Sequence, residues 1–91
     1  MKTVFIVLFK SFYNFEGKEY PITSDTKDIS VFKSLFSALD HVCVNARKWQ
    51  LAGYDRLPYW QDPDSTLYHG GQRVQKNGTA AVWEVQEVPV D

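Results

Sequence analysis

Apolar and polar positions divide the chain into strand-like and helix-like segments. Residues 3–12 are rich in Val, Ile and Phe, with apolar residues at both odd and even positions. This pattern is typical of a central strand covered on both faces. After a turn at Gly17, residues 18–22 predict a return strand, which Pro21 restricts to a sheet edge or a strand end. Residues 29–32 predict another short strand.

Beyond Ser34 the apolar spacing becomes helical. The stripe advances in steps of three and four residues, through Leu35, Leu39, Val42, Ala46 and Trp49. Phe36 and Cys43 widen this stripe, so the thiol is expected on the apolar side of the helix. Ser34 suits the N-cap, and Gly53 suits the residue at which the helix ends.

The C-terminal part of the chain predicts a β-hairpin. Residues 72–76 and 79–88 are strand-like, and the Asn-Gly pair at 77–78 favours a type I′ turn. The parity of the apolar positions shifts at the end of the second arm. A bulge or a change of face is therefore expected near Glu87.

These elements predict a single α+β domain over residues 1–91, with an antiparallel sheet of about four strands and one helix on one face. The aromatic share is 15%, and large aromatic side chains help a short chain to build a core. The stability margin of so short a chain is modest. Because the sheet also leaves at least one open edge, we expect that the chain can pair with a second copy as a homodimer.

The charge and the cysteine content indicate which kinds of partner and which cellular compartment suit this sequence. The net charge is −1 and the charges are scattered, whereas proteins that bind nucleic-acid backbones carry a basic excess. The lone Cys43 permits no internal disulfide, which suits the cytoplasm. Lys10 closes the apolar N-terminal run and no small-residue cleavage site follows, so we interpret this run as a strand and expect neither a signal peptide nor a membrane span.

The search for catalytic or metal-binding chemistry finds no complete set. His41 and Cys43 lie two residues apart on the predicted helix, where side chains diverge, and His69 is distant. A thiol on an apolar helix face is inert. We therefore expect no catalytic residues, no metal and no cofactor, and a protein that is not an enzyme.

Residues 53–71 show no clear period and form a long connection, where function often lies. They carry residue types that dominate binding hot spots, and the predicted partner-binding anchors are Tyr54, Arg56, Tyr59, Trp60 and Tyr68. The same aromatics could instead complete a small core, and both interpretations stay open. Two alternatives are a ligand-binding protein or small enzyme that uses Asp55, Asp62 or His69, and a nucleic-acid binder that stacks bases on these rings.

Four short stretches together resemble a group of very small proteins from phages and other mobile elements. They are residues 2–7, 15–17, 30–34 and 83–91, which leaves residues 50–76 unmatched. The resemblance implies a non-enzymatic module that binds a host protein. Some such proteins are anti-CRISPR-like inhibitors of bacterial defence systems, so a host or defence-system protein is the expected partner.

Overall fold

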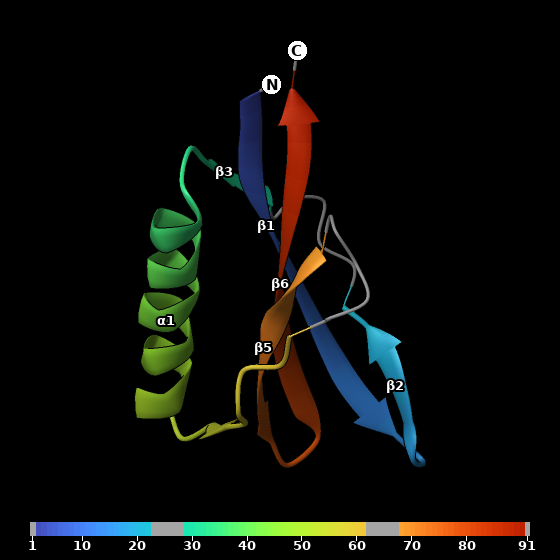
Figure 1. Ribbon diagram of the computed structural model, residues 1–91. Helices are drawn as coiled ribbons and strands as arrows, with labels where there is room; N and C mark the ends of the chain where they lie inside the picture. The colour runs from blue at the N-terminus through green and yellow to red at the C-terminus, as the bar shows by residue number, and fades with distance from the viewer. Residues whose placement is uncertain (1, 23–28, 62–67, 91) are drawn as a thin grey trace.

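The computed structural model describes residues 2–22, 29–61 and 68–90. Within them the chain forms six strands and one helix (Figure 1), namely β1 Lys2–Phe15, β2 Lys18–Pro21, β3 Ile29–Phe32, α1 Leu35–Leu51, β4 Asp55–Arg56, β5 Tyr68–Lys76 and β6 Thr79–Val90. One helix on an antiparallel sheet confirms the α+β class. The expected number of strands was too low, because β3 and β4 both join the sheet that the longer strands form.

The sheet is built around the long antiparallel pair β1–β6. The strand order is β2-β1-β6-β5-β4, and β3 pairs with β1 beside β2. β1 and β6 keep one register from Lys2↔Val90 to Tyr13↔Thr79, so the bulge expected near Glu87 is wrong. The parity shift there reflects an exposed strand end, where no core selects the face. The register shift lies instead in β5, after Tyr68.

The two hairpin turns are of different types, and only the second had a type predicted from the sequence. Glu16 and Gly17 both have positive φ, 52° and 80°, as a type I′ turn requires. At the second hairpin only Gly78 has positive φ, 87°, so the hairpin is confirmed but its turn is not type I′. Asn77 tolerates either sign of φ, and its presence alone therefore does not decide the turn.

The ends of α1 are those that the sequence predicts. The Ser34 hydroxyl accepts a hydrogen bond from the Ser37 N–H at 3.1 Å, and Gly53, with φ of 99°, follows the helix. Across the described parts of the chain, α1 included, no helix is long and apolar enough to cross a membrane.

The buried face of α1 follows most of the predicted stripe, because Val42 and Ala46 are buried and Leu35 and Trp49 pack against the core, but it does not include the residues expected to widen the stripe. Ala38, Val42 and Ala46 are the buried helix residues, whereas Phe36 is 81% exposed and Cys43 is exposed. Alanines allow the helix backbone to lie close to the sheet, but their short side chains give a weak hydrophobic signal. The prediction that Cys43 lies on the apolar side is therefore wrong.

The core lies between α1 and the strands β1, β6 and β5, as the side-by-side arrangement in Figure 1 shows. Its buried residues are Val7, Ala38, Val42, Ala46, Val74, Ala81, Trp83 and Val85. The buried Trp83 is the largest of them, and its ring centroid lies 5.1 Å from that of Phe9 and 6.1 Å from that of Trp49. These aromatic contacts join the helix to the centre of the sheet.

Candidate functional site

Residues 55–60 form a sheet edge instead of the free connection that the sequence predicts. β4 pairs with β5, and the Leu57 N–H donates to the Arg73 carbonyl at 3.0 Å. Trp60 and Gly71 then exchange two backbone hydrogen bonds of 3.0 Å. Between Arg56 and Trp60 the chain advances four residues while β5 advances three, from Val74 to Gly71, so one residue is extra. Because of this irregular pairing, residues 55–60 do not show the two-residue alternation by which a strand is identified in a sequence.

Trp60 is placed by the two adjacent glycines of β5. A Cβ atom at Gly70 would overlap the Trp60 carbonyl oxygen, and one at Gly71 would overlap the Trp60 indole. Gly70 also has φ of 141°, a conformation that other residues rarely adopt. The Gly-Gly pair is thus a docking place for a partly exposed tryptophan.

The structure describes the side chains of four of the five predicted anchors, and these four differ in exposure. The Tyr54 ring packs edge-on against Trp49 at 4.8 Å, and its hydroxyl lies 2.9 Å from the Thr79 hydroxyl. Tyr54 therefore contributes to the fold at the end of α1. Tyr59 is half-buried against Gly70, and the side chain of Tyr68 lies outside the described residues.

Arg56 is exposed but held by the fold. Its Nε donates to Oε1 of the buried Gln72 at 3.2 Å, and its Nη2 lies 3.6 Å from the Cys43 sulfur. Gln72 in turn donates through Nε2 to the Leu57 carbonyl, which ties the edge segment to β5. Arg56 therefore links α1 to the sheet edge through its contacts with Cys43 and Gln72.

The candidate polar residues of the enzyme hypothesis are separated. Asp55 lies opposite Gln75, six residues along β5 from His69, which corresponds to about 20 Å of strand. His69 packs on the Phe5 ring at 5.4 Å, and its Nε2 lies 3.5 Å from Glu87 Oε2. Asp62 lies outside the described residues. The structure thus does not bring Asp55 and His69 into one pocket.

A different surface displays large apolar side chains together. The register Tyr13↔Tyr20, with the Ile22 N–H donating to the Ser11 carbonyl, places alternate residues of the β1–β2 hairpin on one face. We call this the hairpin apolar face; its large side chains are 38% to 58% exposed and are Tyr13, Phe15, Tyr20 and Ile22. The rings of Tyr13 and Tyr20 stack at 5.4 Å, with 23° between their planes.

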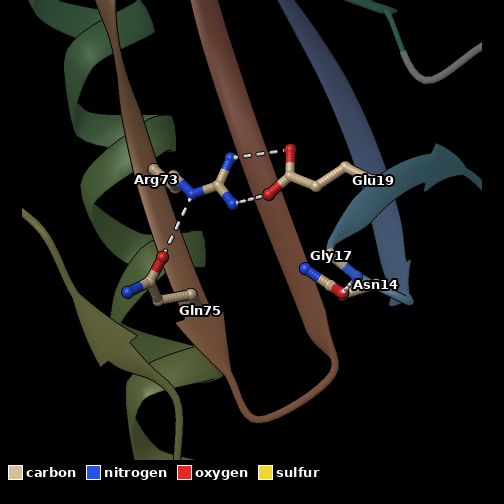
Figure 2. Close-up of polar contacts among 5 residues, drawn as sticks. All are labelled: Asn14, Gly17, Glu19, Arg73 and Gln75. Atoms are coloured by element: carbon tan, nitrogen blue, oxygen red, sulfur yellow. Dashed lines mark hydrogen bonds and ion pairs between the residues drawn. The ribbon is translucent and has the colours of Figure 1, made fainter.

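The opposite face of the hairpin carries polar residues that tie it to the rest of the sheet. Glu19 forms a two-pronged ion pair with Arg73, whose Nε also donates to Gln75 Oε1 at 3.3 Å (Figure 2). The Asn14 N–H donates to the Gly78 carbonyl at 2.8 Å. These residues line a cleft of about 230 Å³ between the two hairpin ends. These contacts tie the hairpin to β5 and to the turn between β5 and β6.

The Glu19–Arg73 pair is expected to stabilise the fold modestly. The two side chains are 42% and 27% exposed, so solvent screens the pair and a double-mutant cycle should give a coupling of at most about 1 kcal/mol. Urea unfolding of Glu19→Gln, Arg73→Gln and the double variant, at low and high salt, measures it. The coupling should fall as salt rises; a salt-independent coupling would show that charge does not hold the hairpin.

The hairpin apolar face stays uncovered because α1 covers only part of the sheet. Tyr13 is the last β1 residue that pairs with β6, and the hairpin extends beyond it. On the same side of the sheet, a groove of about 270 Å³ runs between α1 and β1. It is lined by Val7, Phe9, Ser30, His41, Asn45, Trp49 and Trp83. Groove and hairpin face therefore share the helix side of the sheet.

This face was not predicted because the first strand was expected to end at residue 12, whereas β1 continues to Phe15. The alternation of apolar residues on both sides of Glu16 and Gly17 was the signal that could have identified it. Comparisons of the chain with family models, with curated proteins and with solved structures found no match.

Proposed function

We propose that this protein is a small, non-enzymatic protein-binding module that occludes a surface of its partner, with the hairpin apolar face as its contact. One observation carries the proposal: four large apolar side chains, each more than one third exposed, share one face of a single hairpin. Contiguous apolar patches on soluble proteins commonly mark interaction sites, and tyrosine is a frequent hot-spot residue.

The hairpin is organised before any partner arrives. Tyr13 and Tyr20 stack on each other, and the other face of the hairpin is tied to Arg73 and Gly78. Side chains that are already ordered lose less conformational entropy on binding, which favours affinity. The face therefore suits a rigid contact with an apolar patch on another protein.

The resemblance to phage and mobile-element proteins supports a host protein, including a defence-system complex, as the partner. The stacked tyrosines also suit base stacking, which makes single-stranded nucleic acid the second candidate. Around the hairpin tip, however, the charges are mixed, with Glu16 and Glu19 beside Lys18. Backbone phosphates need clustered cations, so these charges favour a protein.

A pull-down from a bacterial lysate, followed by affinity measurement with the captured protein, tests the proposal. Tyr20→Ala should weaken binding at least about tenfold, because it removes a central exposed ring, while the melting temperature changes little. The control is Leu51→Ala, which removes an exposed apolar side chain at the end of α1 and should leave affinity unchanged. Equal capture by the native protein and the Tyr20 variant would reject the hairpin as the contact.

A further inference from the structure

The outer strands of the sheet differ in how their open edges are protected. β2 contains Pro21, which removes a backbone donor, and β4 is only two residues long. β3 has neither protection: it contains no proline and no charged residue, and among the described strands it pairs with β1 alone. Its Ile29 and Val31 side chains are 50% and 62% exposed. An apolar, unprotected edge of this kind favours pairing with another strand.

The backbone groups of Ile29 and Val31 are those that point outward. The Ser11 carbonyl accepts from Ile22 on the side of β1 that faces β2 and β3, so odd-numbered β1 residues direct their backbone groups to that side. Val7 lies opposite Ser30, which makes this pair hydrogen-bonded. By alternation, the N–H and C=O groups of the two neighbours of Ser30 face away from β1.

We infer that β3 pairs antiparallel with β3 of a second copy of this chain, around a two-fold axis at Ser30. In this register Ile29 lies opposite Val31 of the partner subunit, and each outward N–H meets an outward C=O. The four apolar side chains of the two edges then gather on one face of a continuous sheet. An interface of this kind is self-complementary, as a two-fold axis requires.

The neighbouring surface of α1 supports a second copy as the occupant. Ser30 shares the groove beside β1 with His41 and Asn45, so the axis lies level with the middle of α1. There the outer surface of the helix is hollowed, over about 630 Å³, and lined by Phe32, Phe36, Ser37, Asp40, His41, Val44, Asn45 and Lys48. Two antiparallel helices that meet near Val44 would place Asp40 against Lys48 of the partner subunit, which matches opposite charges.

The contact between the two helices adds buried surface area to the dimer interface, beyond the area that the two paired β3 edges bury. A stable dimer buries about 1,200 Å² or more in total, which is beyond a four-residue edge. Phe36, exposed over 81% of its surface, and Val44 extend the apolar contact across the helix layer. β2 pairs with the other half of β1, so the hairpin apolar face stays free in the dimer and is present twice.

Sedimentation equilibrium of the full chain tests the dimer. The native protein should be a reversible dimer, and Val31→Lys should raise the dissociation constant about a hundredfold or more, because each edge would receive an unpaired charge. Tyr20→Lys, a matched change on the hairpin face, should leave it unchanged. A native protein that stays monomeric at millimolar concentration, or a Val31 variant that dimerises like the native one, would overturn the inference.

A disulfide tests the register independently. In a non-hydrogen-bonded antiparallel pair the Cα atoms lie about 4.5 Å apart, within the range that a disulfide spans. Ser30→Cys in a Cys43→Ser background should therefore form a covalent dimer under mild oxidation. Ser11→Cys in the same background lies on β1 away from this edge and should not. Failure of the Ser30 variant to cross-link, or equal yields from both variants, would reject the axis at Ser30.

Discussion

Replacing Gly70 with alanine is expected to destabilise the protein by about 3 kcal/mol, which corresponds to roughly 12–24 °C in melting temperature for a domain of this size. A Cβ atom at Gly70 meets the Trp60 carbonyl oxygen, which is backbone and has no flexible end to move. The φ of 141° adds strain that any other residue would bear. Thermal unfolding followed by circular dichroism measures the change.

Gly78→Ala is the matched control for this prediction. Gly78 also has positive φ, 87°, but a Cβ atom there meets nothing within 4 Å. This variant should therefore show only the conformational cost, about 1 kcal/mol. A Gly70→Ala cost no larger than that of Gly78→Ala would show that residues 55–60 do not lie against β5.

Replacing Trp83 with alanine is expected to cost about 4 kcal/mol, the second large effect. Trp83 is buried between Phe9 and Trp49, so its removal leaves a cavity at the point where helix and sheet meet. Domains of this size are stable by only about 5–15 kcal/mol, so most of the margin can be lost. Denaturant unfolding should show a much lower midpoint, or no folded baseline.

Two variants separate the loss of packing at Trp83 from a general loss of apolar residues. Trp83→Phe keeps a ring in contact with Phe9 and should cost less than the alanine change. Leu51→Ala removes an apolar side chain that is 81% exposed and should change stability by less than about 0.5 kcal/mol. A Leu51 effect as large as that of Trp83 would show that the loss of any apolar side chain, and not the packing of Trp83, lowers the stability.

The proposed contact and the proposed dimer edge use different parts of β1. β2 pairs with its C-terminal half and β3 with its N-terminal half, so each surface can be altered without the other. A dimer would present two hairpin apolar faces, and linked faces bind a repeated or symmetric partner more tightly than a single one. Loss of the dimer should then weaken binding without removing it.

The candidate site could be predicted from the sequence only in part. The hot-spot composition of residues 54–60 is real, but Tyr54 completes the core and Trp60 docks on Gly71. The apolar alternation around Gly17 was visible, yet nothing local showed that the face would remain uncovered. Composition identifies residues that can anchor a partner, whereas the exposure of their side chains depends on which other parts of the fold cover them.

Features of the fold that have local causes were predictable from the amino-acid sequence. Ser34 caps α1 through a residue three positions away, Gly17 and Gly78 occupy turn positions with positive φ, and the apolar run of β1 specifies a central strand. These features depend on backbone geometry and on neighbours within a few residues. For that reason the α+β class and most element boundaries were predictable.

Tertiary structure alone decided which faces are covered. One helix of 17 residues lies over part of a six-stranded sheet, so the hairpin apolar face stays exposed. Cys43 and Phe36 lie on α1 itself and are exposed there, although their sequence patterns resemble those of buried residues. The pairing of residues 55–60 with β5 also depends on the contact of Trp60 with Gly70 and Gly71, which lie about ten residues further along a segment that shows no period. Whether a side chain is buried depends on how much surface the neighbouring elements cover, and the order of apolar and polar residues along the chain does not specify that coverage.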